Sequence, residues 1–111
     1  MNPDKLEISP TELAALRAVH TAVRLIDCRE EDEWQICRIE GAELMPLSKF
    51  GELSHLRITD SAEQIIIYCH HGMRSQNAAH FLRQKGFPLT WSMDGGIEQW
   101  ALKIDPTTAR Y

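Results

Sequence analysis

The sequence predicts an α/β fold in which short, mostly parallel strands alternate with helices. Short blocks of β-branched and apolar residues recur along the chain, and the most apolar of them is Ile65–Tyr68. A block of this kind suits a strand that is buried on both faces of a parallel sheet. Segments with helical spacing of apolar residues separate these blocks, and no internal repeat or low-complexity linker interrupts them. Such alternation is typical of βαβ units.

Length and composition indicate one globular domain. The chain has 111 residues, of which 43% are hydrophobic and 25% charged, so it can bury a core without metal or disulfide support. We expect a single domain over residues 1–111, with a core at about 5–103 and a tail at 104–111. From its proline and two threonines, we expect the stretch from residue 103 to the end to lie loosely over the surface.

Charge and hydropathy exclude several classes of partner. The net charge of −4 argues against nucleic acid, because binding a phosphate backbone calls for a basic surface. No apolar run approaches the roughly 20 residues of a membrane span, and the first residues contain no hydrophobic signal core. We therefore expect a cytoplasmic protein with neither nucleic acid nor a membrane as partner.

In the first third of the chain, residues 6–8 are expected to form a short edge strand. Ser9 can cap the helix that follows, Pro10 suits the first helical position, and Glu12 completes a capping box. The second apolar run, residues 23–26, is expected to be a strand. Its carboxyl end carries Asp27 and Arg29, which parallel strands would place at the same edge as Cys69.

The remaining elements follow from short local signals. The expected elements are a short helix at 30–36 anchored by Trp34, a strand at 42–45, a helix at 47–56, a turn at 60–63, a strand at 89–93, and a helix bearing Ile97 and Trp100. We interpret Trp34, Trp91 and Trp100 as packing residues.

Cys69 is the strongest candidate for a reactive group. It follows the Ile65–Tyr68 strand, and from Ser75 onward apolar residues recur at helical spacing until Gly86 ends the helix. Ligands of open α/β sheets bind beyond the carboxyl ends of the strands, where the N–H groups of the next helix favour an anion. Gly72 allows the loop N–H groups to turn inward, so we expect Cys69 to be a thiolate. The alternative is an inert, buried thiol.

Three ordered segments resemble the rhodanese family. The first signature is matched by Leu25-Ile26-Asp27-Cys28-Arg29, Glu33-Trp34, Ile39-Glu40-Gly41-Ala42 and Met45-Pro46, the active-site loop by Cys69-His70-His71-Gly72-Met73-Arg74-Ser75, and the closing segment by Asp94-Gly95-Gly96-Ile97 with Trp100.

This resemblance implies a three-layer fold with a five-stranded sheet and helices on both faces. It also implies a sulfurtransferase in which Cys69 forms a persulfide with sulfur from thiosulfate or another donor and passes it to cyanide or a thiol, possible protein acceptors included. The remaining site residues would be a substrate or anion-binding loop of His70, His71, Gly72, Met73, Arg74 and Ser75, with Asp27 and Arg29 in support. No cofactor and no metal are expected.

Other functions remain open at this point. A rhodanese-like binding module or sulfur relay would serve one protein partner and turn over free thiosulfate poorly. Cysteine-dependent phosphatases and arsenate reductases place five residues between cysteine and arginine, whereas four separate Cys69 from Arg74. A loop one residue shorter should fit a persulfide and crowd a phosphate.

Several residues have both a functional and a structural interpretation. Cys37 and Arg38 stand where the family usually has glycine and histidine, and a left-handed Cys37 would be strained. We interpret Cys28 and Cys37 as packing residues, with a resolving thiol as the alternative. For Asp27 we favour a structural role and leave Arg29 open. The side chains of His70 and His71 are expected to face solvent.

Overall fold

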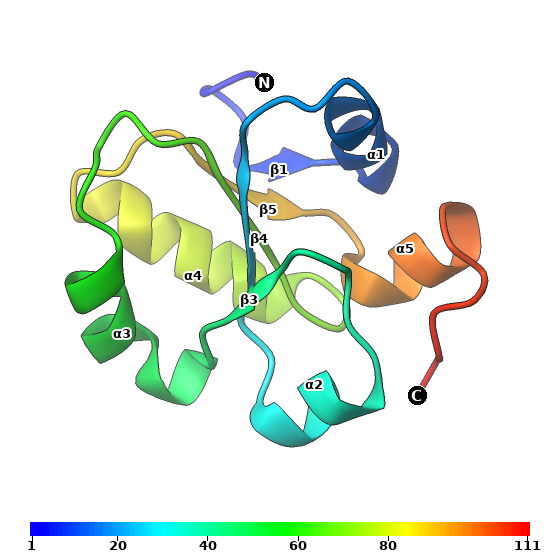
Figure 1. Ribbon diagram of the computed structural model, residues 1–111. Helices are drawn as coiled ribbons and strands as arrows, with labels where there is room; N and C mark the ends of the chain where they lie inside the picture. Colours follow the sequence, from blue (N-terminus) through cyan, green and yellow to red (C-terminus); the bar gives the residue numbers. More distant parts are fainter.

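A single five-stranded parallel sheet forms the centre of the protein. The computed structural model describes all residues, 1–111, and its strand order is β1-β5-β4-β2-β3 (Figure 1). The strands are β1 (Glu7–Ile8), β2 (Arg24–Asp27), β3 (Glu43–Leu44), β4 (Ile65–Tyr68) and β5 (Thr90–Met93). The sheet is entirely parallel, which confirms the predicted fold class and places the carboxyl ends of all strands at one edge.

Helices cover both faces of this sheet. They are α1 (Pro10–Ala18), α2 (Glu31–Ile36), α3 (Phe50–Arg57), α4 (Met73–Gln84) and α5 (Gly96–Lys103), with a 3₁₀ turn η1 (Leu47–Lys49) before α3. Side chains of α3 and α4 share one apolar cluster with the sheet, and those of α1 and α5 share the other. Helix α2 lies beyond the carboxyl ends of the strands (Figure 1).

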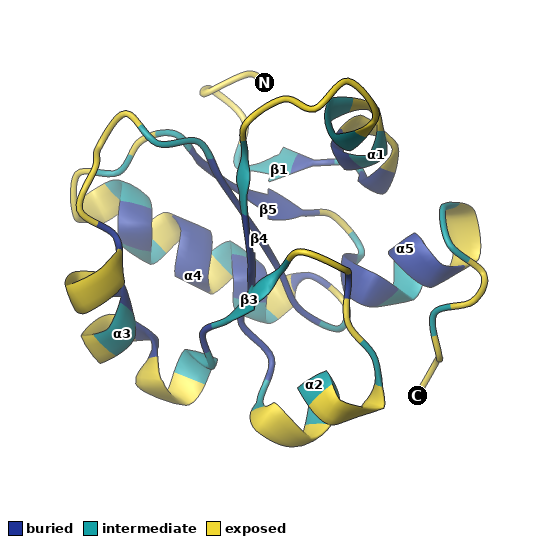
Figure 2. Cartoon of the chain, in the orientation of Figure 1, coloured by how far each residue is buried: buried dark blue, intermediate teal, exposed yellow.

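The central strand shows why the sheet has two apolar faces. Ile65 and Ile67 of β4 join the cluster under α3 and α4, whereas Ile66 and Tyr68 join the cluster under α1 and α5. Successive side chains of a strand point to opposite faces, so a continuous apolar run is what a doubly covered strand requires. All four residues are fully buried (Figure 2). Cys69 comes two positions after Ile67 and belongs to the same apolar cluster as Ile65 and Ile67.

Local capping explains where the first helix begins. The Ser9 hydroxyl accepts a hydrogen bond from the Glu12 N–H at 3.1 Å, and the Glu12 carboxylate accepts one from the Ser9 N–H at 3.5 Å. Pro10 is the first helical residue. The predicted capping box is therefore confirmed.

Two predicted helices differ from those observed. The helix expected at 47–56 is divided into η1 and α3. The helix expected from Ser75 begins at Met73 instead, because Gly72 adopts φ +109° as its N-cap. Met73, Arg74 and Ser75 consequently lie in the first turn of α4, where backbone N–H groups have no partner within the helix.

The expectation of a loose tail after α5 is wrong. Ile104 and Asp105 each donate a backbone hydrogen bond to the Trp100 carbonyl, at 2.9 and 3.0 Å, and the chain then returns beside α2 (Figure 1). The Tyr111 side chain ends in contact with Glu33 and Arg29. No helix of this fold combines the length and the apolar character that crossing a membrane requires.

Candidate active site

Cys69 lies directly after β4 at the edge where the strands end. It is 1% exposed. The Gly72 N–H donates to its Sγ at 3.0 Å, and the Ser75 N–H donates at 3.4 Å. The loop therefore turns back over the sulfur, as predicted, and the first turn of α4 points its positive end at it.

Helix α5 orients this loop by binding its carbonyl groups. The Ile97 N–H donates to the Cys69 carbonyl at 2.8 Å, and the Glu98 N–H donates to the His70 carbonyl at 3.2 Å. Gly96 makes this approach possible, since a Cβ there would lie 2.4 to 2.5 Å from those backbone atoms. With these two carbonyls held by α5, the Gly72 and Ser75 N–H groups are directed at the Cys69 sulfur.

Several backbone N–H groups between Cys69 and the first turn of α4 have no acceptor in the protein. Gly72 and Ser75 donate to the sulfur, but the backbone N–H groups of His70, His71, Met73 and Arg74 make no hydrogen bond. They belong to the loop and to the first turn of α4. Unpaired N–H groups at a helix N-terminus favour the binding of an anion, so these four groups are available to an anionic ligand.

The surroundings of Cys69 favour its thiolate. The pKa of the Cys69 thiol is lowered to about 5, first by a hydrogen bond from the Cys28 thiol, then by the Ser75 hydroxyl and by the Ser75 and Gly72 N–H groups. Burial opposes this change but does not outweigh it. The pKa of Cys28 is raised correspondingly, because its proton is held by the neighbouring Cys69 sulfur.

Ser92 supports the site from β5 and was not among the predicted residues. Its hydroxyl lies 2.7 Å from the Ser75 hydroxyl, and the Ser75 Oγ lies 3.4 Å from Cys69 Sγ. Ser75 and Ser92 are both fully buried. The only sequence signal for Ser92 is a polar residue between Trp91 and Met93 in a strand that is buried throughout.

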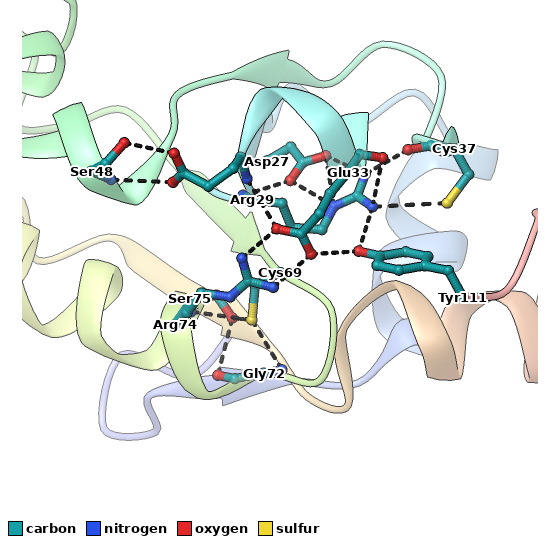
Figure 3. A network of polar contacts seen from close by, with 11 residues as sticks. Asp27, Arg29, Glu33, Cys37, Ser48, Cys69, Gly72, Arg74, Ser75 and Tyr111 are labelled. Atoms are coloured by element: carbon teal, nitrogen blue, oxygen red, sulfur yellow. Dashed lines mark hydrogen bonds and ion pairs between the residues drawn. The ribbon is translucent and has the colours of Figure 1, made fainter. Parts of the chain in front are cut away.

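Arg74 is paired with Glu33 of α2. Its two terminal nitrogens lie 2.6 and 2.8 Å from the Glu33 carboxylate oxygens. This pairing holds the pKa of Glu33 down to about 2, with a smaller contribution from the Tyr111 hydroxyl. The guanidinium lies between Glu33 and Cys69 (Figure 3), so an anion entering the loop meets an arginine that already has a carboxylate partner.

Asp27 and Arg29 form an ion pair with no exposure to solvent. Arg29 Nη2 lies 2.7 Å from Asp27 Oδ2, and both side chains are 0% exposed. Arg29 also donates to the Cys37 carbonyl at 2.6 Å. The structural role favoured for Asp27 agrees with this geometry, and Arg29 shares it by joining β2 to the end of α2.

Tyr111 is a residue of the site that no local sequence signal indicated. Its hydroxyl donates to Glu33 Oε2 and accepts from Arg29 Nη1, both at 2.8 Å. Its ring stacks on His70 with centroids 3.9 Å apart. Tyr111 therefore connects the active-site loop to α2, as Figure 3 shows for its contacts with Glu33 and Arg29. No spacing or motif in the sequence connects Tyr111 to Glu33 or Arg29, which precede it by 78 and 82 positions.

The two histidines of the loop differ from each other. His71 is exposed, as expected, but His70 is half-buried between the rings of His71 and Tyr111. The expectation that the His70 side chain faces solvent is therefore wrong. Burial, and then the neighbouring His71, lower the pKa of His70.

Cys37 does not carry the strain that a glycine-like position would impose. Its φ of −164° is extended backbone, which any residue adopts, so the expected cost of a left-handed cysteine does not arise. Its Sγ lies 3.8 Å from Arg29 Nη1. Cys37 packs against the apolar cluster under α1 and α5, whereas Cys28 belongs to the cluster that contains Cys69.

The fold and the site define an α/β protein with a fully parallel sheet and a buried cysteine between the central strand and the N-terminus of a helix. Residues 9–103 match the model of the rhodanese-like domain. The chain therefore belongs to the rhodanese-like domain family, as the motif resemblance implied.

Curated relatives include larger proteins. The chain is 34% identical over 109 residues to a tRNA uridine(34) hydroxylase of Protochlamydia amoebophila, covering 93% of this chain and 34% of that protein. It is 32% identical over 104 residues to the probable adenylyltransferase/sulfurtransferase MoeZ of Mycobacterium tuberculosis, covering 94% of this chain and 26% of that protein. The chain thus spans about a third or less of these relatives.

Solved structures of similar size share the fold. The human single-domain sulfurtransferase TSTD1 has a TM-score of 0.77 and 23% identity, with 89% of this chain and 97% of that chain covered. A rhodanese-related protein of Thermoplasma volcanium has a TM-score of 0.79 and 25% identity, covering 96% of this chain and 100% of that one. The family thus includes single-domain proteins and segments of larger ones.

Proposed function

We propose that this protein is a sulfurtransferase that carries a sulfane sulfur as a persulfide on Cys69. The observation that supports this most directly is the Cys69 sulfur itself, which accepts hydrogen bonds from the Gly72 and Ser75 N–H groups, in a loop where four further N–H groups have no acceptor. A buried thiolate in such a cradle is a nucleophile beside an anion site.

Thiosulfate suits this arrangement as a donor. The Cys69 thiolate attacks the outer sulfur of thiosulfate, the sulfur–sulfur bond of the donor breaks, and sulfite leaves with the bonding electron pair. The unpaired N–H groups of His70, His71, Met73 and Arg74 would bind the anionic end and stabilise the charge that collects on sulfite. A persulfide donor reacts in the same way and releases a thiolate.

The second half-reaction returns Cys69 to its resting state. A thiophilic acceptor, cyanide or a thiolate, attacks the outer sulfur of the persulfide, and the electron pair of the broken bond returns to Cys69 Sγ. The same N–H groups that lower the thiol pKa make Cys69 a good leaving group.

Intact-mass spectrometry tests the first half-reaction. Reduced protein incubated with thiosulfate should gain the mass of one sulfur, and Cys69→Ser should gain none. Peptide mapping should place the added sulfur on Cys69. If wild type gains no sulfur, or if Cys69→Ser gains it equally, Cys69 is not the carrier.

A phosphatase is disfavoured by the position of Arg74. Both of its terminal nitrogens contact Glu33, so the guanidinium is directed to α2 rather than closing a ring around a tetrahedral anion. Assay with an aryl phosphate should show negligible release of phosphate. Release as fast as sulfur transfer to cyanide would instead support phosphatase activity.

A sulfur relay to a protein acceptor is the second candidate. It is favoured by the relationship to MoeZ, in which a segment like this chain is about a quarter of a probable adenylyltransferase/sulfurtransferase. A relay should load one sulfur quickly and pass it slowly to cyanide or glutathione. An enzyme for free substrates should instead complete many turnovers with either acceptor.

A further inference from the structure

We propose that Cys28 is a resolving thiol: it attacks the Cys69 persulfide, releases the carried sulfur as hydrogen sulfide, and leaves a Cys28–Cys69 disulfide. This inference rests on the proposed function, since it requires a persulfide on Cys69. It adds a second outcome for the bound sulfur, namely reduction to sulfide in place of transfer to an acceptor.

The sheet places the two cysteines side by side. Strands β2 and β4 pair in parallel with Ile26 opposite Ile67 and Asp27 opposite Tyr68, and the Cys28 N–H continues the ladder by donating to the Tyr68 carbonyl at 3.0 Å. Cys28 is therefore the neighbour of Cys69 across the sheet. Paired parallel strands lie about 4.8 Å apart, within the roughly 4.4–6.8 Å that separates the Cα atoms of disulfide-bonded cysteines.

Both side chains also point to the same face. Cys28 comes two positions after Ile26, and Cys69 comes two positions after Ile67, so each points to the same face as that isoleucine. All four residues belong to the apolar cluster under α3 and α4. Both side chains are buried, with 0% exposure for Cys28 and 1% for Cys69. Formation of a bridge therefore requires side-chain rotation rather than movement of an element.

The reaction balances without an external oxidant. The Cys28 sulfur attacks Cys69 Sγ, the inner sulfur of the persulfide, so that a Cys28–Cys69 bond forms while the bond between Cys69 Sγ and the outer sulfur breaks. The outer sulfur departs with that electron pair and takes up the Cys28 proton, so it leaves as hydrosulfide, which gains a second proton from water to become hydrogen sulfide. The two cysteines are oxidised as the sulfane sulfur is reduced, and a dithiol reductant afterwards restores both thiols.

Loading with sulfur changes the electrostatics in favour of this attack. In the resting protein the neighbouring Cys69 thiolate, together with burial, raises the pKa of Cys28. Once Cys69 carries the persulfide, the negative charge resides on the outer sulfur, farther from Cys28 and nearer the loop N–H groups. Cys28 then releases its proton more readily than in the resting protein, so loading with sulfur favours the attack.

Cys37 cannot act as the resolving thiol. Its sulfur lies beside Arg29 at 3.8 Å, and it packs with the cluster on the opposite face of the sheet. It therefore provides a matched control, a third cysteine of the same chain that is outside the proposed pair.

The test follows the persulfide after loading. Protein is incubated with thiosulfate, freed of excess donor, and left without acceptor while intact mass, released sulfide and non-reduced peptides are measured. Wild type and Cys37→Ser should lose the added sulfur, release one equivalent of sulfide per protein and form a Cys28–Cys69 peptide pair. Cys28→Ser keeps a hydroxyl donor beside Cys69 but cannot form the bridge, so its persulfide should persist at least about tenfold longer.

The outcomes separate this inference from the function on which it depends. If no variant gains sulfur from thiosulfate or from polysulfide, both proposals are overturned. If all variants gain sulfur on Cys69 and lose it at equal rates, or if wild type shows no Cys28–Cys69 pair, the sulfurtransferase proposal stands and the resolving role of Cys28 is refuted. Far-UV circular dichroism and the urea midpoint of Cys28→Ser, compared with those of Cys37→Ser, check that the fold is intact.

Discussion

Arg74 and Glu33 form a two-point ion pair at the edge of the active site: Arg74 Nη1 donates to Glu33 Oε1 at 2.6 Å and Nη2 donates to Oε2 at 2.8 Å. They come from different elements, Arg74 from the first turn of α4 and Glu33 from α2. A two-point contact between guanidinium and carboxylate fixes direction as well as distance. The pair therefore braces α2 against the start of the helix that cradles Cys69.

Replacing Glu33 by glutamine should lower stability in a pH-dependent way. The pKa of Glu33 is about 2 in the folded protein and about 4.3 in an unfolded chain. A carboxyl with a depressed pKa contributes stability that is fully present above the unfolded value and is lost as pH falls through the folded value. The urea midpoint of Glu33→Gln should therefore lie below that of wild type by a constant amount above about pH 5, and the difference should shrink toward about pH 2.

Glu31→Gln is the matched control for this experiment. It removes the same charge from the same turn of α2, but Glu31 accepts only a hydrogen bond from Gln35. Its urea midpoint should stay near that of wild type. A difference between Glu33→Gln and wild type that widens as the solution is acidified would contradict the assignment of the ion pair.

The thiolate of Cys69 should be detectable by alkylation. The rate of its reaction with iodoacetamide, followed on the Cys69 peptide, should rise with pH around a midpoint near about 5, well below the roughly 8.5 of a free cysteine. Ser75→Ala should shift the midpoint upward, because a hydroxyl donor to the thiolate is lost. Ser48→Ala, whose hydroxyl contacts Glu30 instead, should leave it unchanged. A wild-type midpoint near 8.5 would show that the cradle does not favour the anion.

Removal of the Tyr111 ring should raise the pKa of His70. That pKa is lowered first by burial and then by His71, and Tyr111 stacks on the ring at 3.9 Å. Exposure favours the charged form of histidine, so in Tyr111→Ala the pKa should move toward about 6.5. Titration of the His70 ring by NMR measures the shift. Tyr111→Phe keeps the ring and should keep the low value, so equal values in all three proteins would refute the role of stacking.

Gly96 should tolerate alanine much less well than Gly86 does. Both have positive φ, +61° and +98°, so each substitution carries the left-handed penalty of about 1–2 kcal/mol. Only at Gly96 would the new Cβ also meet the Cys69 and His70 backbone, at 2.4 to 2.5 Å; at Gly86 nothing lies within 4 Å. Urea unfolding should show a larger loss for Gly96→Ala, and persulfide loading by thiosulfate should slow in that variant alone. Equal losses would mean that the loop adjusts freely to α5.

Local sequence was sufficient for much of the fold. The capping box at Ser9 and Glu12, the buried run Ile65–Tyr68, and the left-handed stop at Gly86 each depend on residues within a few positions of one another. Interactions of that range are encoded in local propensity and periodicity. The same reasoning located Cys69, because the carboxyl end of a parallel strand before a helix is itself a local pattern.

Tertiary structure decided which side chains meet at that edge. Nothing near Glu33 in the sequence indicates that it pairs with Arg74, and nothing near Tyr111 indicates that it stacks on His70. The contact of Cys28 with Cys69 depends on the order β4-β2 within the sheet, which strand propensity does not specify. The sequence by itself determined the fold class and the reactive cysteine, whereas the partners of that cysteine and of its loop were decided by strand order and by the return of the chain after α5, since both bring together residues that are distant in sequence.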